Sequence, residues 1–226
     1  MKINTLLIAN RGEIACRIAR TARAQGITPV GVHSEADANA LHVREIGRSI
    51  LIGAGPASES YLRIDAVLDA ARQVGADAIH PGYGFLAENP DFANAVEAAG
   101  MIFVGPTAET LDRFGDKASA KDAAIAAGVP VVSGASGAKS DPAEIAAAVR
   151  EMGFPVLLKA VGGGGGRGQR LVETENTLMQ DIEGALREAK STFGSEGMLL
   201  ERFLPAARHV EVQIAGDGAG HVVHLF

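Results

Sequence analysis

The sequence lacks the features that define several common classes of protein. It has one cysteine, Cys16, which cannot form a disulfide within the chain, and the apolar helical pattern around it predicts a buried, unreactive thiol. No segment approaches 18 apolar residues free of charge, so we predict no membrane span. There is no long basic run, and 21 basic against 27 acidic residues give a net charge of -6. Nucleic acid is therefore not an expected partner.

Two short signals are missing as well. The amino terminus has neither the long apolar stretch nor the small-residue cleavage site of a signal peptide, and together with the single cysteine this predicts a cytoplasmic protein. The chain contains no Gly-Lys-Ser or Gly-Lys-Thr, so a P-loop nucleotide site is not expected.

Glycine, in contrast, is abundant, with 28 residues, and a run of consecutive glycines occupies 162–166. An ordered glycine costs roughly 0.5–1 kcal/mol relative to alanine, so this glycine run indicates a function that needs bare backbone. Backbone N–H groups without side chains can approach a bulky anion such as a nucleotide polyphosphate. Strand-like segments flank the glycine run, with Lys159 before it and Arg167 after it. We interpret it as the tip of a hairpin that covers phosphates, with a flexible linker as the alternative.

A dinucleotide site is not predicted. Gly163, Gly165 and Gly168 have the spacing of the dinucleotide fingerprint, but the residues that follow alternate like a strand and do not open a helix. The first strand-to-helix turn contains one glycine, Gly12, where that fingerprint has three. On either side of Gly12, Arg11 and Glu13 could serve a ligand at the carboxyl ends of the strands or could form an internal ion pair, and the sequence leaves both open.

The first 115 residues repeat a short apolar run, a turn and an amphipathic helix. We predict strands over 6–9, 30–32, 76–79 and 101–104, and helices over 13–25 and 61–74. Strands that alternate with helices imply crossover connections and a mainly parallel sheet of the Rossmann-like kind.

The pattern changes after a predicted linking helix at 116–127. Helices over 142–151 and 176–190 and strands over 155–161, 169–172 and 198–201 predict a small α+β unit. A strictly alternating strand over 208–214, the turn signal at Asp217 and Gly218, and a returning strand over 221–226 predict a hairpin. Since a domain does not end on an unpaired hydrophobic strand, we expect the chain to be a fragment.

Six segments carry a resemblance to a known family. They are Ile8 to Ala15, His80 to Asn89, Gly115 to Lys117, Lys159 with the glycine run, Glu201 to Leu204, and Arg208 to Gln213. In this order they resemble biotin carboxylase, the ATP-grasp subunit or domain of biotin-dependent acetyl-, propionyl- or methylcrotonyl-CoA carboxylases or of pyruvate carboxylase. The resemblance covers the whole chain.

The resemblance implies an α/β fold in four parts. These are a Rossmann-like, parallel-sheet N-terminal domain at 1–115, a linking helix at 116–132, an α+β ATP-grasp lid at 133–204, and the truncated start of the C-terminal ATP-grasp domain at 205–226.

The implied activity is ATP-dependent carboxylation of biotin on a carrier protein, with bicarbonate activated as carboxyphosphate. The implied cofactors are ATP and magnesium or manganese, with metal ligands and catalytic residues beyond residue 226, so that this chain alone is expected to be inactive. A biotin carboxyl carrier protein or domain and a carboxyltransferase subunit are the implied partners, and the full-length protein is expected to be a homo-oligomer. The alternatives are a non-catalytic nucleotide-binding fragment or another ATP-grasp ligase such as carbamoyl-phosphate synthetase, which the segment 80–89 disfavours.

The residues expected to bind ATP follow from these segments. They are Lys117, Lys159, Gly164, Gly165, Gly166, Glu201, Arg202, Phe203, Leu204 and His209. An ammonium group inside an apolar strand needs a nearby anion, and for Lys159 a phosphate would supply it. The alternative is a lysine whose stem covers apolar surface while its head reaches water. Lys117 is included because the matching lysine of the family contacts the nucleotide.

The segment from Glu201 to Leu204 is expected to bind the adenine. Its backbone could meet the edge of the base, the Glu201 carboxylate could accept from the exocyclic amine, and Phe203 or Leu204 could line an apolar slot. A plain exit from a strand is the alternative. His209 shares a predicted strand face with Glu211, which could orient it, and a merely solvated histidine is the alternative.

Tyr83 follows a predicted strand in a glycine-rich turn, where α/β sheets place their ligands. By resemblance it faces the biotin and bicarbonate pocket, and packing at a domain interface is the alternative. Gln169 departs from the family, which commonly has methionine near the adenine at this position.

Overall fold

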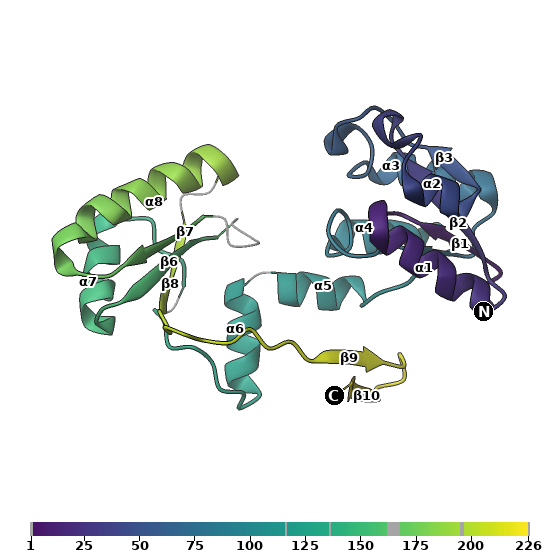
Figure 1. The fold of residues 1–226 in the computed structure, drawn as a ribbon. Helices are drawn as coiled ribbons and strands as arrows, with labels where there is room; N and C mark the ends of the chain where they lie inside the picture. The colour runs from purple at the N-terminus through teal and green to yellow at the C-terminus, as the bar shows by residue number, and fades with distance from the viewer. Residues whose placement is uncertain (1, 116, 136, 162–167, 195–196, 226) are drawn as a thin grey trace. The chain divides into compact units, whose positions relative to one another are not determined.

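The computed structural model describes residues 2–225 except 116, 136, 162–167 and 195–196. The chain divides into two compact units, Met1–Ala123 and Ala124–Phe226, and Figure 1 labels the elements of each.

The first unit is built on a five-stranded parallel sheet in the order β3-β2-β1-β4-β5. Its strands are β1 (Thr5–Ile8), β2 (Thr28–His33), β3 (Ser49–Leu51), β4 (Ala78–His80) and β5 (Ile102–Phe103). The strand order reverses at β1, so the carboxyl ends of β1 and β4 form the switch point at which such sheets bind ligands. The parallel sheet confirms the predicted α/β class.

Six helices belong to the described part of this unit or cross its boundary. They are α1 (Gly12–Ala24), α2 (Leu41–Ile46), α3 (Ile64–Val74), α4 (Pro90–Ala98), α5 (Ala108–Gly115) and α6 (Lys117–Ala126), with short 3-10 helices at Glu35–Asp37 and Ala57–Glu59. The predicted helix over 61–74 starts too early, because the structure begins α3 at Ile64. Helix α2 and strand β3 were not predicted, because both are too short to show a clear period in the sequence.

Alternation along β1 explains the core of the first unit. Leu7 enters the cluster on one face of the sheet, whereas Leu6 and Ile8 enter the cluster on the other. Helix α1 turns Ala15, Ile18, Ala19 and Ala22 toward the second cluster at the spacing of one helix face. Cys16 is buried on the same helix, with 6% of its surface exposed, as predicted.

His42 is a buried titratable group in α2. Its Nε2 lies 3.1 Å from the carbonyl oxygen of Val32, and its Nδ1 has no partner in the part of the chain that the structure describes. Burial is the largest influence on its pKa and lowers that pKa below 6.5, so the fold keeps the ring neutral. As the pH falls below 6.5, the unfolded chain binds a proton that the folded chain excludes, and the free energy of unfolding must fall.

We therefore predict that the first unit loses stability between pH 7.5 and 5.5, and that His42→Gln, whose amide can still donate to Val32, loses less. The difference per pH unit is at most about 1.4 kcal/mol for one proton. Urea midpoints measured at the two pH values test this. If the unchanged protein and His42→Gln show the same pH dependence of the urea midpoint, His42 has no such role. His80, whose pKa burial also lowers, is present in both proteins and would then account for the dependence.

The second unit contains a three-stranded antiparallel sheet in the order β7-β6-β8. Its elements are β6 (Val156–Ala160), β7 (Gln169–Val172), β8 (Met198–Arg202), α7 (Pro142–Met152) and α8 (Leu178–Phe193), with a 3-10 helix at Glu175–Thr177. Both helices pack on one face of the sheet (Figure 1), where Val156, Leu158 and Ala160 of β6 are buried. The Asp141 side chain caps α7 by accepting from the N–H groups of Ala143 and Glu144.

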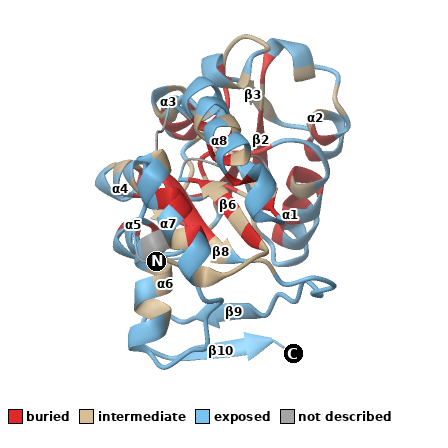
Figure 2. Cartoon of the chain, turned by 90° about the vertical axis from the view of Figure 1, so that its left-hand side faces the viewer, coloured by how far each residue is buried: buried red, intermediate tan, exposed pale blue. Residues whose placement is uncertain are grey.

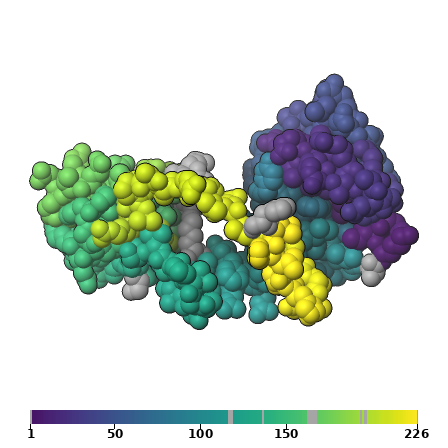
Figure 3. Space-filling view, turned by 60° about the horizontal axis from the view of Figure 1, so that its bottom comes forward, coloured from purple at the N-terminus to yellow at the C-terminus, as the bar shows by residue number. Residues whose placement is uncertain are grey.

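A separate antiparallel hairpin consists of β9 (Gln213–Gly216) and β10 (Val222–Leu225). Asp217 forms its turn by accepting from the N–H groups of Ala219 and His221, as the turn signal predicted. The predicted strand over 208–214 is largely wrong, because residues 208–212 form no strand and Val210 is 72% exposed. Both strands are exposed throughout and are drawn in pale blue in Figure 2; Figure 3 colours the same residues yellow.

No helix among the described residues combines the length and the apolar character needed to cross a membrane.

Candidate functional site

Lys159 lies on the face of the second unit's sheet that the helices leave uncovered. Along β6, buried residues alternate with half-buried ones, so Leu157 and Lys159 share the face opposite the helices. The register pairs Lys159 with Gln169 on one side and Leu199 on the other, and it pairs Leu157 with Glu201. Directly paired residues of an antiparallel sheet point to the same side. This face therefore combines three leucines with a cation, an anion and an amide, Leu171 being the third leucine.

Lys159 and Glu201 form an ion pair between Nζ and Oε2. The two side chains are 24% and 25% exposed, so the pair is partly shielded from water. The anion that this lysine needs is thus supplied by the neighbouring strand in the structure. Two of the residues expected to bind ATP are brought together across 42 positions of sequence.

In the rest of the segment expected to bind adenine, Arg202 and Phe203 already donate hydrogen bonds within the second unit. Arg202 is the last residue of β8; its N–H donates to the Ser133 carbonyl at 2.9 Å, and its Nη1 donates to the Met152 carbonyl at 3.2 Å. The N–H of Phe203 donates to the Pro155 carbonyl at 3.1 Å. Leu204 is 51% exposed and follows the strand.

The remaining residues expected to bind ATP are not assembled with this pair. Gly164, Gly165 and Gly166 lie outside the described residues, and Lys117 begins α6 with a side chain that is also outside them. His209 has an 84% exposed side chain, and among the described residues its polar partner is Glu211, with 3.2 Å between His209 Nε2 and Glu211 Oε1.

Arg170 links β7 to α8 on the helix side of the sheet, and this link was not predicted from the sequence. Its guanidinium lies 3.7 Å from the Asp181 carboxylate and 3.6 Å from the Glu188 carboxylate. Helix α8 makes room for it at Gly184, where a Cβ would lie 3.1 Å from the guanidinium carbon. Gly184 was the available signal in the sequence. A glycine inside a helix lowers the stability of the helix, so its presence indicates that another group occupies the space of the missing side chain.

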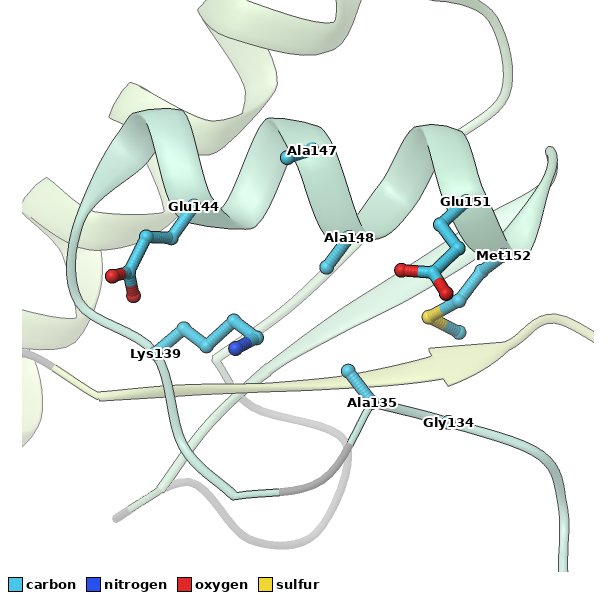
Figure 4. Close-up of a pocket in the computed structure, with 8 residues that line it drawn as sticks. All are labelled: Gly134, Ala135, Lys139, Glu144, Ala147, Ala148, Glu151 and Met152. Atoms are coloured by element: carbon cyan, nitrogen blue, oxygen red, sulfur yellow. The ribbon is translucent and has the colours of Figure 1, made fainter.

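A hollow of about 770 Å³ lies between α7 and the segment that pairs with the edge of β8. Figure 4 shows Lys139 extending beneath α7, with Glu144 and Glu151 on either side of it. None of the residues expected to bind ATP lines this hollow.

In the first unit, the turn that carries Tyr83 meets the end of β1 at the switch point. The Asn10 amide nitrogen donates to the carbonyl oxygens of Pro81 at 2.7 Å and Tyr83 at 2.8 Å. The Tyr83 hydroxyl donates to Glu13 Oε1 at 2.6 Å, and this bond, followed by the negative charge of Glu13, raises the pKa of Tyr83. Tyr83 is 62% exposed and borders a hollow of about 330 Å³ with Asn10 and Arg11.

Arg11 pairs with Asp37, at 3.0 Å between Nη1 and Oδ2. Of the two alternatives left open, the internal pair between Arg11 and Glu13 is therefore wrong, because Arg11 pairs with Asp37 and Glu13 accepts from Tyr83. Asp37 also accepts from Tyr61 at 2.7 Å and from Ser34 at 3.0 Å. Burial raises the pKa of Asp37, but the bonds from Tyr61, Arg11 and Ser34 outweigh it and leave that pKa below its usual value.

Tyr61 belongs to the Asp37 cluster, which consists of Asp37 and the three side chains bonded to it, Arg11, Ser34 and Tyr61. Tyr61 is 1% exposed, and burial together with its bond to Asp37 raises its pKa to about 12. Its ring stacks on Phe85 with 4.9 Å between centroids, and the Arg11 guanidinium carbon lies 5.2 Å from the Tyr61 ring. Neither Asp37 nor Tyr61 was predicted as a partner of Arg11, since no local pattern connects segments so far apart in the sequence.

The described residues contain no group of three or more His, Cys, Asp or Glu side chains arranged to hold a metal ion.

Comparison with protein families divides the chain in two. Residues 2–111 match the family "Biotin carboxylase, N-terminal domain", and residues 116–226 match "Carbamoyl-phosphate synthase L chain, ATP binding domain".

Curated relatives resemble the chain over almost all of its length. Biotin carboxylase of Pseudomonas aeruginosa is 51% identical over 99% of this chain and 50% of the relative. The mitochondrial methylcrotonoyl-CoA carboxylase subunit alpha of Dictyostelium discoideum is 48% identical over 99% of this chain and 32% of the relative. The chain thus spans about half the length, or less, of these relatives.

Solved structures agree in fold. Biotin carboxylase of Campylobacter jejuni, in a complex with beta-gamma-ATP, has a TM-score of 0.93 at 44% identity, over 99% of this chain and 50% of that one. The biotin carboxylase domain dimer of Hydrogenobacter thermophilus 2-oxoglutarate carboxylase, with MgADP, ADP and bicarbonate, has a TM-score of 0.93 at 42% identity, over 99% of this chain and 49% of that one.

Proposed function

The chain belongs to the biotin carboxylase family, and from that membership we propose that it supplies ATP-binding elements to an enzyme that carboxylates biotin on a carrier protein. In this proposal bicarbonate is activated by ATP as carboxyphosphate. A biotin carboxyl carrier protein or domain and a carboxyltransferase subunit are the proposed partners, with homo-oligomerisation of the longer protein. The proposed location is the cytoplasm. The proposed division of the chain remains 1–115, 116–132, 133–204 and 205–226.

The Lys159–Glu201 pair is the observation that carries the proposal. It lies on an uncovered sheet face, and Lys159 is followed by the glycine run within a few residues. Phosphoryl transfer depends on positioning and on neutralising charge, and an ammonium group on this face can meet a phosphate. Two solved relatives contain beta-gamma-ATP or MgADP, which supports the same ligand class here.

The remaining residue roles are proposed from the resemblance to the family. Glu201 would accept from the adenine amine, and because the N–H groups of Arg202 and Phe203 are engaged, the contact with the base falls to Leu204 and to the carbonyl groups of the segment. Gly164, Gly165 and Gly166 would cover the phosphates, with Lys117 and His209 as further contacts. Tyr83 would face the biotin and bicarbonate pocket.

Magnesium is proposed as the partner of ATP, but the described residues do not fit a metal site, so no step of the reaction is assigned to a metal on this chain.

A fusion of residues 1–226 to the remaining half of the Pseudomonas aeruginosa relative tests the proposal. We expect both the chain and the fusion to bind ATP in calorimetric titrations. We expect only the fusion to incorporate labelled bicarbonate into carrier-bound biotin. A folded fusion that binds ATP without carboxylating biotin would contradict the proposal, and so would carboxybiotin formed by the chain alone.

Carbamoyl-phosphate synthesis is a second candidate, because residues 116–226 match an ATP-binding domain named for that enzyme. The match of residues 2–111 to the biotin carboxylase N-terminal domain favours the first. Carbamoyl phosphate formed by the fusion from ATP, bicarbonate and ammonia would support the second candidate instead.

A further inference from the structure

The turn that carries Tyr83 has a backbone that needs external support. Gly82, Gly84 and Phe85 have φ angles of 67°, 68° and 43°, in the left-handed region. Phe85 has a Cβ, so this conformation is strained unless the surroundings impose it. The stacking of Phe85 on Tyr61, together with Arg11 at 5.4 Å from the Phe85 ring, holds that end of the turn.

Asn10 holds the other end. It is 3% exposed, and its amide nitrogen donates to the carbonyl oxygens of both Pro81 and Tyr83. Its Oδ1 accepts from the Arg11 N–H at 2.8 Å, which fixes the orientation of the amide. A Cβ on Gly82 would lie 2.8 Å from the Asn10 amide nitrogen, so the turn is wrapped closely around this side chain.

Both ends of Tyr83 are therefore tied to the few residues that follow β1. Its carbonyl oxygen is bound by Asn10, and its hydroxyl is bound by Glu13 in the first turn of α1. We propose that Asn10 is a positioning residue, which fixes the turn so that the Tyr83 side chain stands over the carboxyl end of β1 with its hydroxyl at Glu13. The consequence for catalysis rests on the proposed function, in which Tyr83 faces the pocket for biotin and bicarbonate.

The substitution Asn10→Asp tests the proposal because the side chain keeps its shape. A carboxylate has no hydrogen to donate and would face two carbonyl oxygens, so the turn should detach and the bond between Tyr83 and Glu13 should break. The chain has two tyrosines, so their ionisation can be followed by ultraviolet absorbance. We expect the pKa of Tyr83 to fall toward the ordinary value of about 10.

Tyr61 reports whether the variant is folded. Its phenol, with a pKa of about 12, stays un-ionised while Tyr83 titrates, whereas an unfolded chain ionises both phenols together. The variant Tyr83→Phe assigns the lower step. Asn89→Asp is the matched control, because the Asn89 side chain accepts from the Phe92 N–H at 2.9 Å, a task that aspartate performs equally well.

The proposal requires a lowered Tyr83 pKa in Asn10→Asp and an unchanged one in Asn89→Asp. If Asn10→Asp does not fold, Gly82→Ala, which presses on the same contact, must lower the Tyr83 pKa. An unchanged Tyr83 pKa in a folded Asn10→Asp protein would overturn the proposal, as would an equal shift in Asn89→Asp.

The fusion separates this inference from the proposed function. With an active fusion, Asn10→Asp should lower the rate of biotin carboxylation by about tenfold or more while leaving the KM for ATP unchanged. A fusion without carboxylase activity would contradict the proposed function, yet the phenol titration would still decide the role of Asn10.

Discussion

Replacing Lys159 with methionine is expected to weaken ATP binding by about 10- to 150-fold, which is the loss of one charge-assisted contact worth about 1.5–3 kcal/mol. The substitution removes the cation from the uncovered sheet face and leaves the Glu201 carboxylate without its partner. That carboxylate would then repel the phosphates. Isothermal titration of the 226-residue chain with ATP measures the change.

Two further variants separate attraction from repulsion. Lys159→Met combined with Glu201→Gln should bind ATP more tightly than Lys159→Met alone, because the double variant has no unpaired carboxylate. Lys139→Met is the matched control, since this lysine lines the hollow beside α7, where none of the expected ATP residues lies. An equal loss of affinity in Lys139→Met and Lys159→Met would show that the sheet face is not the phosphate site.

The substitution Gly53→Ala is expected to destabilise the first unit by about 3 kcal/mol or more, through a backbone clash added to backbone strain. A Cβ on Gly53 would lie 2.0 Å from the Glu59 carbonyl oxygen, and the φ of 143° is one that alanine rarely adopts. The backbone is held at both places. The Gly53 carbonyl accepts from the Glu35 N–H, and the Glu59 carbonyl is followed directly by buried Ser60 and Tyr61.

Gly55→Ala is the control from the same loop. Its Cβ would meet the Ala36 side chain at 3.3 Å, and its φ lies outside the left-handed region. We expect a change within about 1 kcal/mol. Urea unfolding followed by circular dichroism compares the two variants, and similar midpoints for both would contradict the clash at Gly53.

Local pattern was sufficient to predict the elements whose period is long and regular. The apolar run at 154–158 predicted a strand with Lys159 in it, and the lysine does have an anion beside it, although this is Glu201 and not the phosphate that was expected. That the anion is Glu201 depends on the register of β6 against β8, which joins residues far apart in sequence. No local signal contains that register.

The same limit explains the errors near the switch point. Arg11 was considered with Glu13 because both flank Gly12, but the fold brings Asp37 and Tyr61 to this place from other segments. Residues 208–212 show the opposite case, in which alternation predicted a strand but the described chain provides no neighbour for it. The roles of the expected ATP residues and of Tyr83 remain proposals.

Both tyrosines belong to the first unit and the sequence contains no tryptophan, so the intrinsic fluorescence of the protein comes from one unit alone. Tyr61 and Tyr83 each donate a hydrogen bond to a carboxylate. Their emission is therefore expected to change when the Asp37 cluster or the turn that carries Tyr83 is disturbed. The sheet with Lys159 and Glu201 contributes no emission. A change in tyrosine fluorescence upon addition of ATP would therefore report an effect on the first unit. Binding of ATP with no change in tyrosine fluorescence would indicate an effect on the second unit alone.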